Sequence, residues 1–203
     1  NLENLLNAIG VGISLDLPLK TIKAGIEALN VVPGRLERIP DPRGRFVYVD
    51  YAHKPDALEN VLLALRALTV DRIVCIFGCG GDRDRLKRPL MGAIAARLSD
   101  LAVITSDNPR SEAPMAIIDE ILTGVKSVRT HVYTSGDLQR RGFDQQGYAV
   151  EPDRRKAILL GVKASAPGDT LLIAGKGHET YQIIGKERFD FDDRVEVAKA
   201  LME

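Results

Sequence analysis

From residue 46 onward, short apolar runs alternate with longer segments in which apolar residues recur every three to four positions. A short apolar run bounded by turn residues is typical of a buried strand, and the longer periodicity is typical of a helix that packs on one face. The pattern predicts strands over residues 46–50, 72–77, 101–106, 128–134 and 170–174. It predicts helices over residues 55–68, 89–98, 113–123, 153–164 and from 193 onward, with a hairpin over 181–189. Such alternation predicts an α/β fold with a mostly parallel sheet and helices on both faces.

Three other segments do not follow this alternation. Residues 2–12 and 18–29 read as two short helices, because their apolar residues also recur at helical spacing, and Pro33-Gly34 then ends the periodicity. Residues 135–152 are rich in polar side chains and glycine, so we expect a surface excursion there.

The composition excludes several classes of protein. Lys and Arg together number 28, as do Asp and Glu, and this zero net charge argues against a dedicated nucleic-acid binder. No apolar run approaches the roughly 20 residues of a transmembrane helix, and the first residues lack the basic region of a signal peptide. Cys75 and Cys79 are too few for a metal quartet or a disulfide framework, so we expect reduced thiols and a cytoplasmic location. The first residue is not Met, which suggests a piece of a longer chain.

Polar loops follow four of the predicted strands, at residues 50–53, 78–83, 107–110 and 175–179. In an open parallel sheet the carboxyl ends of the strands share one edge, where ligands bind. We therefore expect these four loops to converge on one site.

The loop Asp107-Asn108-Pro109-Arg110 is the most informative of the four. Pro109 lacks an N–H and restricts Asn108 to extended geometry, so the loop is stiff. Asn108 offers an amide, and Arg110 offers a planar guanidinium that suits a carboxylate. A stiff loop with these groups predicts amino-acid binding, whereas Asn-Pro alone would usually indicate only a turn.

The loop after the first strand predicts nucleotide contacts. Asp50 can accept hydrogen bonds from ribose hydroxyls, and His53 and Arg35 can stack on or steer a nucleotide. Each residue alone is more often a helix-capping carboxylate, a loop histidine or a surface arginine.

The two glycine-rich loops suit charged groups of a ligand. Glycine lets the backbone of residues 78–83 approach a ligand, and Arg83 with the downstream Lys87-Arg88 makes the mouth of this loop cationic. In the loop Gly175–Glu179, the Glu179 carboxylate can bind an ammonium. Neither loop has the spacing of a phosphate-binding P-loop, and a tight turn is the ordinary alternative for both.

Together these motifs resemble the C-terminal part of the Mur ligases, in particular the members that add diaminopimelate. The residues that carry the resemblance span nearly the whole chain and are Asn4, 32–35, 50–58, 77–84, 87–89, 106–110 and 175–179. The resemblance implies a Rossmann-like C-terminal domain over residues 33–203. It also implies that residues 1–32 are the end of a central ATP-binding domain.

The resemblance implies an activity as well. Members of the family use ATP and Mg²⁺ to join an amino acid to a nucleotide-linked peptide in peptidoglycan synthesis. ATP phosphorylates the terminal carboxylate of the peptide, and the amino group of the incoming amino acid displaces the phosphate. The substrates implied here are meso-diaminopimelate and UDP-N-acetylmuramoyl-L-alanyl-D-glutamate. The N-terminal and central domains of the same protein would be partners, and neither a nucleic acid nor a membrane is expected.

By position, the resemblance assigns two sets of binding residues. The ATP set is Asn4, at the adenine, with Arg35, Asp50 and His53. The meso-diaminopimelate set is Arg83, Asp107, Asn108, Pro109, Arg110, Gly175 and Glu179. Arg110 would pair with the second carboxylate of diaminopimelate, which lysine lacks. Glu179 and the Gly175 carbonyl would take the second ammonium.

The family's phosphate loop, carbamylated lysine and magnesium-binding residues are absent from the 203 residues, so we expect them upstream of Asn1. No catalytic residue and no metal ligand is therefore assigned here, and the chain alone should be inactive. Two alternatives stay open: a relative that adds lysine or glutamate, and a non-catalytic module that binds an amino acid or a nucleotide. Arg110 and Glu179 argue against the first.

Overall fold

The computed structural model describes residues 2–29, 31–69 and 71–203. The chain divides into two compact units, residues 1–32 and 33–203. In the first unit, α1 (Leu2–Ser14) and α2 (Leu19–Ala28) are the two helices expected from the periodicity. α2 has no fully buried residue, and its apolar side chains Ile22 and Ile26 are only partly buried.

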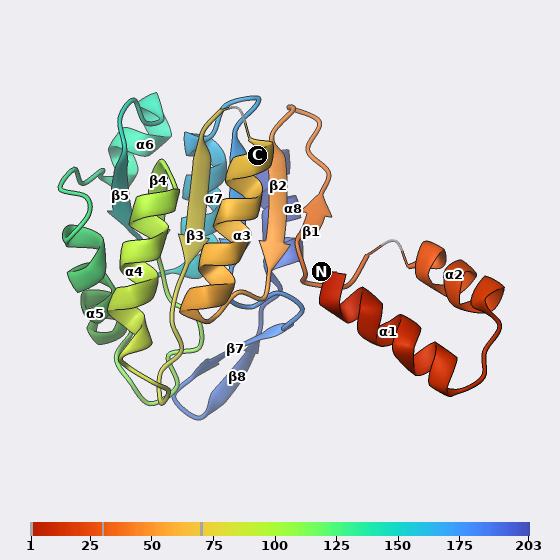
Figure 1. Ribbon diagram of the computed structural model, residues 1–203. Coiled ribbons are helices and arrows are strands. Elements are labelled where there is room, and N and C mark those ends of the chain that lie inside the picture. Colours follow the sequence, from red (N-terminus) through yellow and green to blue (C-terminus); the bar gives the residue numbers. More distant parts are fainter. Residues whose placement is uncertain (1, 30, 70) are drawn as a thin grey trace. The chain divides into compact units, whose positions relative to one another are not determined.

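The second unit is built on a six-stranded sheet with the order β1-β2-β6-β3-β4-β5 (Figure 1). The strands are β1 (Glu37–Ile39), β2 (Phe46–Asp50), β3 (Ile73–Phe77), β4 (Leu101–Ile104), β5 (Gly147–Val150) and β6 (Thr170–Ala174). β2 to β6 are parallel, and only β1, which the sequence pattern did not predict, runs antiparallel to its neighbour. The predicted α/β fold with a mostly parallel sheet is confirmed.

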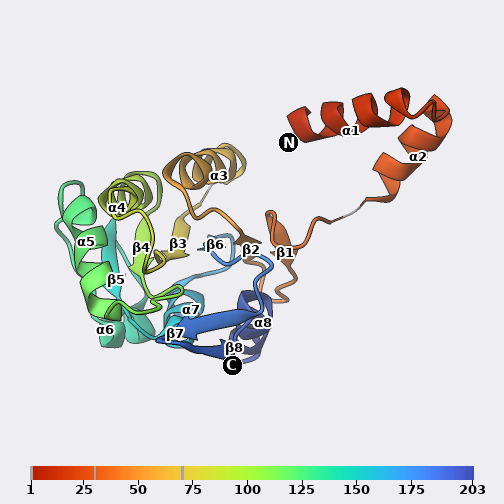
Figure 2. The ribbon, with the colours of Figure 1, turned by 90° about the horizontal axis from the view of Figure 1, so that it is seen from below.

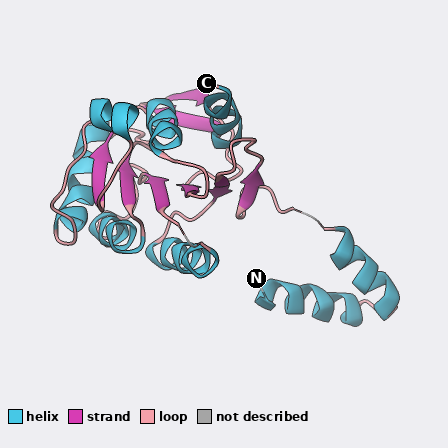
Figure 3. Ribbon diagram, turned by 90° about the horizontal axis from the view of Figure 1, so that it is seen from above, coloured by secondary structure: helices cyan, strands magenta, loops and turns pink. Residues whose placement is uncertain are grey.

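Three helices cover each face of the sheet (Figures 2 and 3). One face carries α3 (Pro55–Leu68), α4 (Lys87–Leu98) and α5 (Pro114–Lys126). The other face carries α6 (Ser135–Arg141), α7 (Arg154–Ala164) and α8 (Asp193–Met202). A separate hairpin of β7 (Tyr181–Ile184) and β8 (Glu187–Asp190) lies beyond the carboxyl ends of the central strands (Figure 1).

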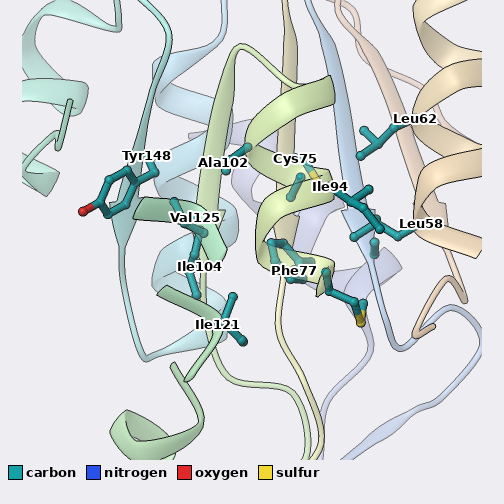
Figure 4. Packing of buried hydrophobic residues seen from close by; sticks show 14 of the residues in the cluster. Leu58, Leu62, Cys75, Phe77, Ile94, Ala102, Ile104, Ile121, Val125 and Tyr148 are labelled. Atoms are coloured by element: carbon teal, nitrogen blue, oxygen red, sulfur yellow. The ribbon is translucent and has the colours of Figure 1, made fainter. Parts of the chain in front are cut away.

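The core has two layers because successive side chains of a strand point to opposite faces. In β3, Cys75 and Phe77 pack under α3 and α4, while Val74 and Ile76 pack against the helices of the other face. Figure 4 shows the first layer, with Phe77 among the buried side chains. Burying a side chain of this size contributes roughly 1.5–3 kcal/mol, so apolar packing on both faces stabilises the central strands.

The strand predicted over residues 128–134 is wrong. Val132 forms only an isolated bridge with Tyr148, and the strand that pairs with β4 is β5. At Gly147, the first residue of β5, an added Cβ would lie 2.9 Å from the carbonyl oxygen of His131. The two segments therefore approach each other closely at glycine. β5 has only four residues and begins with glycine, which has a low strand propensity, so the sequence pattern does not predict it.

The expected surface excursion over residues 135–152 is also wrong. This segment forms α6 and β5, and Leu138 and Phe143 are buried in the core. Leu138 and Phe143 stand alone among polar residues, and the apolar run at residues 148–150 is only three residues long, so the segment carries a weak apolar signal.

Candidate functional site

The four polar loops meet at the carboxyl edge of the sheet. They surround a cavity of about 670 Å³, within the usual size range of small-molecule sites. Its lining includes Tyr51, His53, Gly80, Arg83, Asp107, Asn108, Arg110, Gly175, Glu179 and Tyr181. This cavity is called the carboxyl-edge pocket below. It brings together six of the seven residues predicted to contact diaminopimelate, with His53 from the nucleotide set.

Glycines let two walls of the pocket pack against each other. A Cβ at Gly81 would overlap the carbonyl oxygen of Pro109, and one at Gly80 would lie 2.9 Å from Nη1 of Arg110. The Gly81 amide donates to the carbonyl of Asn108 (2.9 Å). The 78–83 loop is therefore fitted to the backbone of the 107–110 loop.

Arg110 is fixed through both its backbone and its side chain. Its φ is +51°, in the left-handed region, and its N–H donates to the carbonyl of Ile183 (3.1 Å) while its carbonyl accepts from Gly185 (2.7 Å). The β7–β8 hairpin thus pairs with the loop and stabilises this strained backbone. In the described part of the chain, only Nη1 of its guanidinium donates, to the carbonyls of Gly81 (2.8 Å) and Asn108 (3.4 Å). Nε and Nη2 have no hydrogen-bond partner among the described residues.

A buried lysine joins the other wall of the pocket. Lys176 has no exposed surface, and its Nζ lies 3.0 Å from Oδ1 of Asn108, 3.3 Å from Oδ1 of Asp107 and 3.5 Å from Oε2 of Glu179. The Asn108 amide in turn donates to Oε2 of Glu179 (2.9 Å), and Gln182 donates to the Asp107 carbonyl (2.7 Å). Sequence reasoning missed Lys176, although the residue stands inside the glycine motif at 175–179.

Opposite charges around the pocket balance. The cationic side chains in its lining are Lys54, Arg83, Lys87 and Arg110, and the carboxylates are Asp56, Asp84, Asp107 and Glu179. Four charges of each sign suit a ligand that is itself a zwitterion, such as an amino acid.

Arg88 does not contribute to this cationic mouth, contrary to the expectation from the sequence. Its side chain is fully buried and donates to the carboxylates of Glu112 and Glu120 and to the carbonyl of Gly80 (3.2 Å). The Arg88 guanidinium lowers the pKa of Glu112 to about 2. Glu112 also accepts from the Asp82 amide (2.7 Å), so this network supports the 78–83 loop from below.

The residues assigned to the nucleotide differ in how well their surroundings suit that role. Arg35 lies over the ring of Tyr51 at 5.0 Å, and Tyr51 packs against the rings of His53 and His178. This cluster of planar side chains fits a nucleotide base or ribose by stacking. Asp50 is only 5% exposed, and its two carboxylate oxygens accept from the amides of Leu36 and Ala52.

Asp50 is therefore a weaker fit to a ribose than its place at a strand end suggests. Burial raises the pKa of this carboxyl above its ordinary value, even though the two amide hydrogen bonds act in the opposite direction.

Asn4 lies in α1, in the first unit. Its assignment to adenine stays a prediction.

Pro109 lies outside the carboxyl-edge pocket. It lines a neighbouring cavity of about 540 Å³ together with Ile184, Phe189 and Phe191 of the hairpin region. Its contribution to the pocket is therefore the loop geometry that the sequence suggested, and not a direct wall.

The titratable groups at the pocket provide hydrogen bonds rather than a nucleophile. Burial, followed by the negative charge of Glu179, raises the pKa of Tyr51, so its hydroxyl stays protonated. Burial raises the pKa of Cys79 to about 12, which keeps this thiol protonated and unreactive. Among the described residues, no group of three or more His, Cys, Asp or Glu side chains is arranged to hold a metal ion.

The sequence and fold of this chain have counterparts among known proteins. The family model of the Mur ligase glutamate ligase domain matches residues 34–177. The chain belongs to the Mur ligase family. Within the described residues of this Mur ligase chain, no helix is long and apolar enough to cross a membrane.

The similarity extends beyond the residues matched by the family model. Over 203 residues, the chain is 53% identical to the UDP-N-acetylmuramoyl-L-alanyl-D-glutamate–2,6-diaminopimelate ligase of Geobacter metallireducens, covering all of this chain and 40% of that protein. A solved structure of a ligase with the same name has a TM-score of 0.70 at 37% identity, over 100% of this chain and 38% of that one.

The UDP-N-acetylmuramate-alanine ligase of Thermotoga maritima, at 19% identity and a TM-score of 0.61 over 98% of this chain and 37% of that one, shares the fold. The chain thus spans about 40% of the length of the curated relatives it matches.

Proposed function

We propose that this chain is the amino-acid-binding part of an ATP-dependent ligase that adds meso-diaminopimelate to UDP-N-acetylmuramoyl-L-alanyl-D-glutamate in peptidoglycan synthesis. The observation that carries the proposal is the pair of groups in the carboxyl-edge pocket: the Arg110 guanidinium and the Glu179 carboxylate. A ligand with a carboxylate and an ammonium at its far end satisfies both. The names of the relatives that match the whole chain support the same substrate.

Four residues of the pocket then have defined tasks. Nε and Nη2 of Arg110 would bind the second carboxylate of diaminopimelate, which lysine does not have. Glu179 and the Gly175 carbonyl would bind the second ammonium, and the exposed Arg83 would bind the carboxylate next to the attacking amine. The chain's residues thereby orient the nucleophile.

ATP, when bound, would supply the activation of the peptide carboxylate, and Mg²⁺ would accompany it. In this chain, Arg35, Tyr51 and His53 would contact the nucleotide. We assign residues 1–32 to the end of the ATP-binding domain and residues 33–203 to the acceptor domain. The magnesium ligands and the phosphate-binding groups are assigned to the additional length of the relatives, and the cytoplasm is the proposed location.

Substitution of Arg110 tests the proposal. In the full-length ligase, Arg110→Ala should raise the KM for meso-diaminopimelate by 10²-fold or more, because a buried polar site rejects a poorly matched ligand strongly. The KM for lysine, which has no second carboxylate, should change little. If the wild-type enzyme uses lysine and diaminopimelate equally well, the lysine-adding alternative is supported. If the wild type and Arg110→Ala have equal KM values for diaminopimelate, the role of Arg110 is refuted.

A further inference from the structure

Lys176 is a fully buried cation whose three side-chain partners all line the carboxyl-edge pocket. These partners are Asp107, Asn108 and Glu179. Arg154 is also fully buried, but it donates to Asp193 and to the carbonyls of Ser106 and Ala174, none of which lines this pocket. Arg154 therefore acts on Asp107 and Glu179 only through its charge, whereas Lys176 contacts both carboxylates directly.

Within the cluster of Lys176, Asp107 and Glu179 the carboxylates outnumber the cation by one, although the lining of the whole pocket is balanced. Two carboxylates, Asp107 and Glu179, share the single ammonium of Lys176. Lys176 occupies Oδ1 of Asp107 and Oε2 of Glu179, while Oδ2 of Asp107 and Oε1 of Glu179 accept no hydrogen bond from the described residues. The second cation that would balance this cluster can come from a ligand.

Lys176 also fixes the direction of these free oxygens. Lys176 and the backbone N–H of Ile183 both donate to Oδ1 of Asn108 (3.0 Å each), so that the amide nitrogen of the same side chain points at Glu179, 2.9 Å away. Lys176 further lies 5.8 Å from the centre of the Tyr181 ring, which closes the cluster on the side of the hairpin. Without the Lys176 charge, the two carboxylates would repel each other, and Glu179 would keep only the hydrogen bond from Asn108 to oppose that repulsion.

We propose that Lys176 is a positioning residue that sets the selectivity of the pocket for a ligand carrying a second ammonium group. The proposal rests on the proposed function, because it assigns that ammonium to the far end of the acceptor amino acid. Lys176 does not touch the ligand. It orients Asp107, Asn108 and Glu179 and leaves one unpaired negative charge for the ligand to neutralise.

The test compares two acceptors in the full-length ligase. Meso-diaminopimelate carries the second ammonium, and 2-aminopimelate has the same carbon skeleton and both carboxylates but lacks it. Lys176→Met removes the charge while keeping a long unbranched side chain. We expect it to raise the KM for meso-diaminopimelate by about 10- to 100-fold, the range of a lost charged hydrogen bond. The KM for 2-aminopimelate should change by less than about threefold on the same scale, because that ligand does not use the cluster.

Two further variants separate positioning from a general loss of structure. Lys176→Arg keeps the charge and should restore at least part of the preference for diaminopimelate. Arg45→Met removes a 5% exposed cation that pairs with Asp41 at the start of β2, away from the pocket, and should lower stability without changing the preference. KM does not depend on how much of the enzyme is folded, so an unstable variant still gives an answer.

The outcomes are distinct. A Lys176→Met enzyme that loses affinity for both acceptors equally, or for neither, would overturn the positioning role. If the wild-type enzyme does not prefer diaminopimelate over 2-aminopimelate, the proposed function itself is overturned. That result is obtained without any Lys176 variant, so the two failures can be distinguished.

Discussion

Removing one partner of the buried pair Arg154–Asp193 should be one of the most destabilising single changes in the second unit. Both side chains have no exposed surface, and two hydrogen bonds of 2.8 and 2.7 Å join the guanidinium to the carboxylate. Burial alone would lower the pKa of Arg154, but Asp193 holds it above its ordinary value, so the arginine stays charged. Asp193→Asn keeps the shape of the side chain and leaves that charge without its counter-ion.

The expected loss follows from the cost of an unpaired buried charge. Breaking a buried pair by removing one partner costs about 3–5 kcal/mol. A domain has a total unfolding free energy of about 5–15 kcal/mol, so about a fifth or more of it is lost. With a urea dependence of about 2 kcal/mol per molar, the midpoint should fall by roughly 2 M. The melting temperature should fall by about 6–20 °C for a chain of this size.

Equilibrium urea unfolding of the 203-residue chain, followed by circular dichroism, measures this loss. The double variant Arg154→Met, Asp193→Leu should recover part of it, because removing both partners leaves no unpaired charge. Recovery should be incomplete, since Arg154 also donates to the carbonyls of Ser106 and Ala174, which then lose a partner at about 1–3 kcal/mol each. A loss below about 1 kcal/mol for Asp193→Asn would refute the reasoning, since the carboxylate would then not be compensating a buried charge.

Two other substitutions test the loop that carries Arg83. Gly81→Ala places a Cβ onto the carbonyl of Pro109, so the two loops must separate. We expect the KM for diaminopimelate to rise at least tenfold and the free energy of unfolding to fall by about 1–3 kcal/mol. Gly25→Ala is the control: its Cβ would lie in open space, so the KM should not change. For Glu112, the lowered pKa means that its ion pair with Arg88 stabilises the fold fully above about pH 4.5 and less as the pH falls toward 2. The difference in urea midpoint between the wild type and Glu112→Gln should therefore shrink between pH 7 and pH 3, and a constant difference would contradict the assignment.

The alternation of apolar runs predicted most of the fold because the central strands are buried on both faces. β2 and β6 were predicted with their observed bounds, since every neighbour of such a strand favours apolar, β-branched residues. β5 is an edge strand that begins at Gly147, and it was missed because its identity depends on pairing with β4 and not on its own composition. Edge elements of this kind are determined by contacts between segments far apart in the chain.

Convergence of the four loops was also predictable, because parallel strands place their carboxyl ends at one edge. The protonation and pairing of individual side chains were not. Arg88 stands next to Lys87 in the sequence, yet Arg88 is buried in an ion pair with Glu112 while Lys87 lines the pocket. A helix turns by about 100° between neighbours, so adjacent cations can face the core and the site.

A motif match describes this pocket only in part, because some of its geometry is set by residues far away in the chain. Pro109 accounts locally for a stiff loop, but the left-handed backbone of Arg110 is held by Ile183 and Gly185, more than 70 residues later in the chain. Lys176 likewise acts on a loop near residue 107. A change in the hairpin turn can therefore alter acceptor preference without touching any residue of the recognised motifs. A relative that keeps Asp107–Arg110 but has a different hairpin should bind its acceptor differently.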